Sequence, residues 1–415
     1  MVAFIVVLVV LAVLALVDIY TLKALKLALK KRFKSWMIWF WILPSVFTLV
    51  ALIYVFNLPD EYPGGDRIKT FYFISAVSLT ALATKGVVFM FHLVDDVIFI
   101  LKRAFKSIFQ KEEPNTEGER ISRGSFLTQL GVGAGALALG SFIHGVTRGK
   151  YNYRVANVSL TFPDLPEAFN GVKILQISDM HLGSFLEDDN PVVPGLDLIN
   201  EQEADYIFFT GDLVNSFAKE AEYWIPHFKS LKSKRGKFSI LGNHDYGDYG
   251  LEKDTAEYYE NLARLKAIHG EMGFDLLLDR TTELEIEGET IDLIGVENWG
   301  RGRFPKYGDF KRATPGVDLN RFNILLSHDP THWEDHIMNK ENVNLTLSGH
   351  THGFQLGVGL GNFKWSPASL RFDRWKGLYE ENGKYLYVNT GFGFLGFPGR
   401  VNMAPEITVF TLNKG

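Results

Sequence analysis

Five short apolar runs between residues 172 and 353 each end in a small residue followed by a side chain that can bind a metal or move a proton. Runs of this kind are typical of strands that are buried on both faces of a sheet. Ligand sites in open α/β sheets form outside the carboxyl ends of the strands, so we expect these side chains to meet at one rim. They are Asp179, His181, Asp212, Asn243, His244, His328, His350 and His352.

The segments between the runs favour a mixed α/β fold. Helix-like patterns at 194–203, 218–232 and 255–269 alternate with the runs, as helices do in βαβ units. After residue 275 the pattern changes to two alternating segments, 283–286 and 290–294, whose Glu-Gly-Glu connection predicts a hairpin.

The chemistry of the eight side chains indicates a metal site. The chain has no cysteine, so any metal must be held by His, Asp, Glu or Asn, a donor set that suits divalent Mn, Fe or Zn. One ion cannot use so many groups, so we expect two ions that share a bridging carboxylate. Such a pair clamps the oxygens of an in-line phosphoryl displacement and acidifies a bound water. A net charge of −5 gives no reason to expect nucleic-acid binding.

In order and spacing, these motifs resemble those of the calcineurin-like metallophosphoesterases, and most of all their membrane-attached bacterial branch. The motifs are Asp179-x-His181, Gly211-Asp212, Gly242-Asn243-His244-Asp245, His328 and Gly349-His350-x-His352. The resemblance covers residues 170–410 and implies a four-layer α/β/β/α sandwich around two facing sheets. This branch includes enzymes similar to UDP-2,3-diacylglucosamine pyrophosphatase.

The resemblance also implies a role for each motif residue. It implies two divalent ions, with Mn favoured, held by two groups that share Asp212 as a bridge: Asp179, His181 and His352 for the first ion, and Asn243, His328 and His350 for the second. His244 would lie beside the ions, stabilise the transition state and protonate the leaving oxygen. Asp245 would either orient His244 or hold its loop.

Four neighbouring features have two interpretations each, and all lie in residues 297–400. Arg301, in a loop with Trp299, is a candidate substrate-binding residue or part of a solvated loop. Arg400 is a candidate for contacting the substrate phosphate, or it forms a structural ion pair. The apolar stretch 354–375 contacts a lipid or the bilayer surface, or it belongs to the core. Asp329, beside His328, is better explained as a turn or cap residue than as a ligand.

The amino-terminal part of the chain has a different composition. Its apolar segments are long enough to cross a bilayer as helices, and they lie at 2–19, 36–56, 71–90 and 126–146. Because loops 20–35 and 102–124 are basic and the intervening loop is acidic, the positive-inside rule places the two basic loops in the cytoplasm. Everything after residue 146 is then expected on the outer face, periplasmic or extracellular. Lys85 is expected to snorkel to the cytoplasmic interface rather than mark an ion pathway.

These observations predict a multi-pass cell-membrane protein with two domains. Residues 1–147 form a four-helix transmembrane segment, and residues 148–415 form the metallophosphoesterase domain. The enzyme would hydrolyse a phosphodiester, pyrophosphate or phosphomonoester, lipid-linked forms included, by metal-activated hydroxide attack. The alternative is a metal-binding membrane sensor or pseudoenzyme, against which the complete ligand set and His244 argue.

Overall fold

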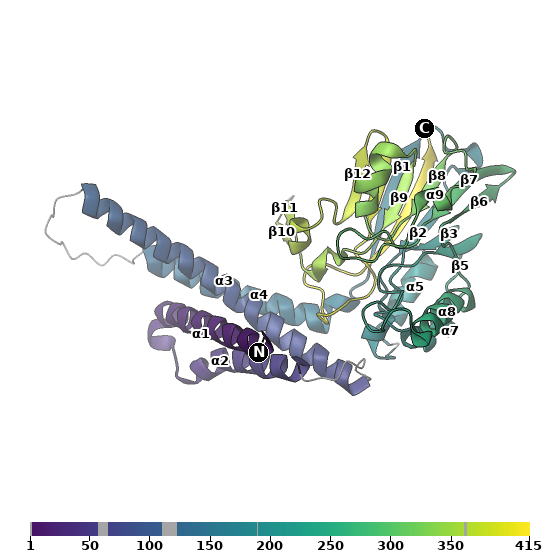
Figure 1. The fold of residues 1–415 in the computed structure, drawn as a ribbon. Helices are drawn as coiled ribbons and strands as arrows, with labels where there is room; N and C mark the ends of the chain where they lie inside the picture. Colours follow the sequence, from purple (N-terminus) through teal and green to yellow (C-terminus); the bar gives the residue numbers. More distant parts are fainter. Residues whose placement is uncertain (1, 57–64, 110–122, 189, 361–362) are drawn as a thin grey trace. The chain divides into compact units, whose positions relative to one another are not determined.

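Two compact units make up the described chain, and Figure 1 shows their elements. The computed structural model describes residues 2–56, 65–109, 123–188, 190–360 and 363–415. The first unit, Met1–Val146, is called the helical unit, and the second, Thr147–Gly415, the sheet unit. The predicted acidic turn at 59–64 and residues 110–122 of the second basic loop lie outside the described residues.

Long apolar helices build the described part of the helical unit. They are α1 (Val2–Leu29), α2 (Trp36–Phe56), α3 (Gly65–Phe109) and α4 (Arg123–Thr147). Three stretches are long and apolar enough to cross a membrane, namely Val7–Arg32, Lys69–Phe105 and Phe126–Thr147, and the apolar stretch Trp36–Ala51 is shorter. The prediction of an amino-terminal segment of apolar helices is therefore confirmed.

The first helix is longer than predicted. It does not end near residue 19 but continues to Leu29, so Lys23 and Lys26 lie on a helix rather than in a loop. Leucine, lysine and alanine dominate this extension, and all three are strong helix formers, so no residue there ends the helix.

The expectation that Lys85 snorkels to the interface was wrong. Its side chain is buried inside the helical unit, where its Nζ lies 2.5 Å from Asp18 Oδ1 and donates a hydrogen bond to Ser45 Oγ at 2.6 Å. The ion pair joins α3 to α1 and the hydrogen bond joins α3 to α2. A partner for each buried charge offsets part of the cost of removing both from water.

The sheet unit contains two six-stranded sheets. The first has the order β1-β14-β2-β3-β4-β5, with bounds β1 Arg154–Phe162, β14 Glu406–Lys414, β2 Lys173–Ile177, β3 Tyr206–Phe209, β4 Gly236–Ser239 and β5 Asp275–Leu276. The second has the order β12-β13-β9-β8-β7-β6, with bounds β12 Gly377–Glu381, β13 Lys384–Val388, β9 Leu345–Ser348, β8 Asn323–Leu326, β7 Glu289–Gly295 and β6 Arg280–Ile286. Strands β6 and β7 pair antiparallel, so the predicted hairpin is confirmed.

Helices cover the outer faces of the two sheets. The helices of the first side are α5 (Val193–Glu201), α6 (Lys219–Glu222), α7 (Ile225–Lys229) and α8 (Ala256–Glu271), and α5, α7 and α8 lie together in Figure 1. The second side carries α9 (Phe310–Ala313), the π-helical turn η5 (Trp333–Ile337) and α10 (Met338–Lys340).

The cores show that the sheets face each other. Ile324 of β8 packs with Phe208 of β3 in a core shared by both sheets, whereas its neighbour Leu325 packs with Trp333 in a second core under η5 and α9. Successive side chains of a strand point to opposite faces, so β8 is covered on both. The predicted four-layer α/β/β/α sandwich is therefore confirmed.

Parallel pairing sets where the strands end. Strands β2, β3 and β4 are parallel neighbours in the first sheet, and β7, β8 and β9 are parallel neighbours in the second. Apart from Lys173 at the start of β2, every residue of β2, β3, β8 and β9 is buried. The carboxyl ends within each group of strands therefore lie at one edge of their sheet.

Candidate metal centre

Each predicted ligand follows the carboxyl end of one of five strands. Asp179 and His181 follow β2, Asp212 follows β3, Asn243 and His244 follow β4, His328 follows β8, and His350 and His352 follow β9. The facing sheets bring the five loops together, and two groups of side chains result, each with its ligand atoms within 4.8 Å of one another.

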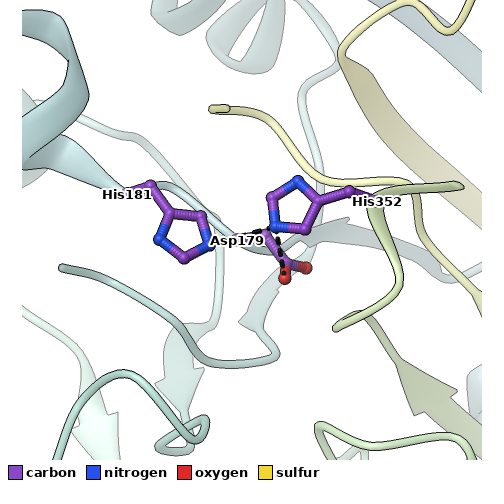
Figure 2. A group of neighbouring side chains, drawn as sticks. All are labelled: Asp179, His181 and His352. Carbon is purple, nitrogen blue, oxygen red and sulfur yellow. Dashed lines mark hydrogen bonds and ion pairs between the residues drawn. The ribbon is translucent and has the colours of Figure 1, made fainter. Parts of the chain in front are cut away.

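The first group is Asp179, His181 and His352, and Figure 2 shows both imidazole rings gathered around the carboxylate. His181 Nε2 lies 3.0 Å from His352 Nε2, which lies 3.1 Å from Asp179 Oδ1. Burial, followed by the neighbouring His352, holds the pKa of His181 well below its ordinary value, so its ring is neutral. Neutral imidazole is the form that binds metal ions.

The second group is Asp212, His328 and His350. His328 Nε2 lies 3.1 Å from Asp212 Oδ2, and His181 Nε2 of the first group lies 3.6 Å from the same oxygen. A single carboxylate oxygen therefore faces both groups. Asn243 lines the same cavity as Asp212, and its buried Oδ1 has no hydrogen-bond partner among the described atoms, so this oxygen is available to a cation.

The charges at the second group favour a cation. Burial alone would raise the pKa of Asp212, but His328 and His244 hold it well below its ordinary value. Burial alone would lower the pKa of His328, but Asp212 and Asp179 raise it to about 10. The ionised carboxylate of Asp212 thus stabilises the protonated ring of His328, and a divalent ion can take the place of that proton. The donor set and the unpartnered Asn243 oxygen fit a site for divalent metals.

The backbone at the ligands is strained. Five of the predicted ligands have left-handed backbone angles, with φ of 51° at Asp179, 46° at His181, 61° at Asp212, 70° at His350 and 49° at His352. Such conformations cost roughly 1–3 kcal/mol each in non-glycine residues and concentrate at functional sites. The strain turns these side chains out of the strand direction and toward each other.

Two glycines allow the ligand loops to approach closely. A Cβ atom at Gly242 would collide with Oδ1 and the backbone nitrogen of Asp212, and one at Gly349 would collide with Oδ2 of Asp179. A glycine before Asn243 and before His350 is therefore a requirement of loop-to-loop packing.

Contacts behind the ligands orient their rings. His181 Nδ1 lies 3.1 Å from Asn215 Oδ1, and His328 Nδ1 lies 2.7 Å from the carbonyl of Thr210, so each ring is turned with Nε2 toward the site. Such outer partners fix the tautomer and raise the basicity of a metal-binding histidine. Sequence reasoning missed Asn215, whose only signal is that it lies three residues beyond Asp212.

Asp329 also lies behind a ligand. It accepts a hydrogen bond from Thr331 N at 2.8 Å, which confirms its interpretation as a turn residue. Its buried Oδ2 lies 3.8 Å from His350 Nε2, beyond hydrogen-bond distance, and has no hydrogen-bond partner among the described atoms.

Asp245 holds the loops of two predicted ligands together. Its Oδ2 accepts hydrogen bonds from the backbone nitrogens of Asp212 and Gly242, both at 2.8 Å, and its Oδ1 accepts one from Leu213 N at 2.8 Å and one from Val214 N at 3.3 Å. Of the two roles considered for Asp245, the structure favours holding the loop.

A cavity of about 310 Å³ opens on the candidate centre, and Asp212, Asn243, His244, His350 and His352 line its polar end. His244 Nδ1 lies 2.7 Å from the carbonyl of Asn215, so it donates there and the opposite ring nitrogen is free to exchange a proton. Burial lowers the pKa of His244, while Asp212 counteracts part of that effect.

Of the two arginines singled out in the sequence, Arg400 lies behind the candidate centre, where its Nη2 is 3.3 Å from His352 Nδ1, and Arg301 lies among carboxylates. Arg301 forms ion pairs with Asp335 and, at 3.0 Å, with Glu334. Arg400 is buried and donates to the carbonyls of Gly393 at 2.7 Å and Thr390 at 2.8 Å. Contact of either arginine with substrate stays a prediction.

The apolar stretch 354–375 divides between surface, cavity and core. Leu370 is 81% exposed, Phe354 is exposed and lines the cavity, and Phe372 is buried and lines it too. Arg371 also lines the cavity, and sequence reasoning missed it because no motif surrounds it.

Comparison with known proteins finds two family models that match this chain. Residues 3–150 match the family model described as "Probable Calcineurin-like phosphoesterase, transmembrane domain", and residues 172–354 match "Calcineurin-like phosphoesterase". The uncharacterized metallophosphoesterase YkuE of Bacillus subtilis (strain 168) is 32% identical over 308 residues, which cover 71% of this chain and 99% of YkuE.

Two further relatives are also named as metallophosphoesterases or as carrying a metallophosphoesterase domain. An uncharacterized metallophosphoesterase of Aquifex aeolicus (strain VF5) is 30% identical over 281 residues, 67% of this chain and 97% of its own. A Danio rerio transmembrane protein with a metallophosphoesterase domain is 26% identical over 279 residues, 66% of this chain and 60% of its own. With its apolar helices, its sandwich and two candidate metal-binding groups, the chain belongs to the calcineurin-like metallophosphoesterases and is a membrane-associated phosphoric ester hydrolase.

Proposed function

We propose that the chain hydrolyses phosphodiester, pyrophosphate or phosphomonoester bonds with two divalent ions, of which Mn is favoured. The observation that carries the proposal is the position of Asp212 Oδ2, 3.6 Å from a histidine nitrogen of the first group and 3.1 Å from one of the second. A carboxylate oxygen placed in this way can bridge two cations. Bound divalent ions would lower the pKa of water and offset charge on the phosphoryl group.

The protein's own residues supply orientation and proton transfer. His244 lines the cavity beside Asp212, and its Nδ1 is held by the carbonyl of Asn215. Its Nε2 would take up a proton and donate it to the oxygen of the leaving group. The backbone hydrogen bonds that Asp245 accepts hold the loops of Asp212 and Asn243 together while this happens.

The two parts of the chain would have separate tasks. Residues 1–147 would anchor the protein by four transmembrane helices, and residues 148–415 would carry out hydrolysis on the outer face. Lys30, Lys31 and Arg32 at the end of α1 support this orientation, because basic residues favour the cytoplasmic side. Anchoring confines the enzyme to the bilayer plane and therefore favours a lipid-linked substrate.

The hydrolysis of bis-p-nitrophenyl phosphate by the purified full chain with added Mn²⁺ tests the proposal. We expect turnover that falls at least a hundredfold in Asp212→Asn and in His244→Gln. The exposed Asp275→Asn, on β5, is the matched control and should retain full activity. A wild-type chain that binds Mn²⁺ but is inactive on diesters, pyrophosphates and monoesters would favour the metal-binding sensor instead.

A further inference from the structure

Arg371 lines the cavity at the candidate centre but has no role in the proposed hydrolysis. Its side chain lines the same cavity as His350 and Asp212, yet it belongs to neither metal-binding group. Its guanidinium carbon lies 4.6 Å from the centre of the Phe304 ring and 5.5 Å from that of Phe372. Two aromatic rings therefore flank a cation at the wall of the site.

The guanidinium has no protein anion to neutralise it. Within the described part of the chain no carboxylate pairs with Arg371, whereas Arg374, three residues later, pairs with Glu334 at 3.4 Å and Glu381 at 3.1 Å. A planar guanidinium is the side chain best suited to bind carboxylate or phosphate oxygens in pairs. Its position in a cavity of a phosphoric ester hydrolase points to an anion on the substrate.

The turn that carries Arg371 is tied to the candidate metal centre. The preceding 3₁₀ helix η7 (Pro367–Leu370) is capped by the buried Ser366, whose Oγ accepts a hydrogen bond from Ala368 N at 3.1 Å and donates one to the carbonyl of Gly353 at 2.6 Å. Gly353 directly follows His352. The backbone of Arg371 is therefore fixed relative to a predicted ligand, as a recognition residue must be.

The spacing keeps Arg371 within reach of a substrate held at the candidate centre. The Phe304 ring centre lies 4.6 Å from that of His350 and 4.6 Å from the guanidinium, so the cation lies at most about 9 Å from the His350 ring centre. One aromatic ring separates the two. A substrate held at the metal centre can therefore reach Arg371, which belongs to neither metal-binding group.

We infer that Arg371 determines specificity by binding a second anionic group of the substrate, a phosphate or a carboxylate, next to the phosphoryl group that is hydrolysed. This inference rests on the proposed function and deepens it. The aromatic rings of Phe304, Phe354 and Phe372 line the same cavity and would contact the organic part that joins the two anions.

The test compares three p-nitrophenyl substrates whose products are quantified by chromatography, because cleavage of a diphosphate at its anhydride bond releases no p-nitrophenolate. Bis-p-nitrophenyl phosphate carries no second anion, 4-carboxyphenyl p-nitrophenyl phosphate carries a carboxylate, and p-nitrophenyl diphosphate carries a second phosphate. In Arg371→Gln, we expect kcat/KM on one or both doubly anionic substrates to fall about ten- to a hundredfold, mainly through KM, with less than a twofold change on the first. Arg371→Lys should restore part of the loss because it keeps the charge. The two doubly anionic substrates separate phosphate from carboxylate recognition.

Controls separate a specific effect from a structural one. Arg264→Gln removes an exposed arginine of α8 that pairs with Glu222 and Glu271, and it should leave all three activities unchanged. Independently of turnover, 4-carboxyphenyl phosphate should raise the Tm of the wild-type chain more than phenyl phosphate does, and the difference should vanish in Arg371→Gln.

Two results would overturn the inference while leaving the proposed function intact. One is an equal loss on all three substrates in Arg371→Gln, and the other is no loss on any of them. A wild-type chain inactive on every substrate would overturn the proposed function and this inference with it.

Discussion

Replacing Asp245 by asparagine tests whether one buried carboxylate holds the candidate centre together. The carboxylate accepts four backbone hydrogen bonds, two at each oxygen, and it is fully buried. An asparagine keeps one acceptor oxygen and presents an amide donor in place of the other. Whichever way the amide lies, two backbone N–H groups lose their acceptor.

The magnitude follows from those two groups. A buried donor left without a partner costs roughly 1–3 kcal/mol, so Asp245→Asn should lower the free energy of unfolding by about 2–6 kcal/mol. For a unit of this size the Tm should fall by roughly 5–20 °C. Because the broken bonds hold the loops of Asp212 and Asn243, hydrolysis should fall as well.

Calorimetry of the detergent-solubilised full chain with metal chelated at pH 8.5 measures this effect. Burial, and after it Asp212, raises the pKa of Asp245 to about 7, so pH 8.5 ensures that the wild-type carboxyl is ionised. Asp275→Asn, which removes an exposed ion pair with Arg280, should change the Tm by no more than a degree or two. If Asp245→Asn melted within about 2 °C of the wild type, the carboxylate would not be holding the loops.

Three further predictions concern other parts of the chain. Asn215→Ala should weaken Mn²⁺ binding about 10- to 100-fold by releasing Nδ1 of His181, and metal titration that shows no change would contradict this. Burial lowers the pKa of His332 to about 3, so this residue takes up its proton first in the unfolded chain as the pH falls below 6.5. The contribution of His332 to stability should therefore fall by roughly 1.4 kcal/mol per pH unit toward pH 3, and His332→Gln should reduce the slope of the free energy of unfolding by about that amount in denaturant unfolding; an unchanged slope would refute this. Lys85→Met leaves Asp18 buried without its partner and should lower the free energy of unfolding by about 3–5 kcal/mol. A double variant that also carries Asp18→Leu should recover most of the lost Tm. Equal Tm values in the single and the double variant would refute the pairing.

The sequence by itself determined the five buried strands that precede the ligands and the identity of the predicted ligands. Short apolar runs fix the buried strands because each must be covered on both faces, and the burial of every residue of β3 and β8 agrees with this. Ligand identity is a local property, since Asp179-x-His181 and Gly349-His350-x-His352 can be recognised without knowledge of where either loop lies.

Contacts between distant segments were decided only by the tertiary structure. Lys85 and Asp18 are 67 residues apart, so an isolated lysine in an apolar helix gives no sign of its partner. Arg371 follows an apolar turn without a motif, and its place in the cavity depends on Phe304, which lies in a separate loop. Asn215 acts through the ring of His181, which another strand supplies. Periodicity and spacing describe each segment alone, whereas the orientation of a ring or a guanidinium depends on packing between segments.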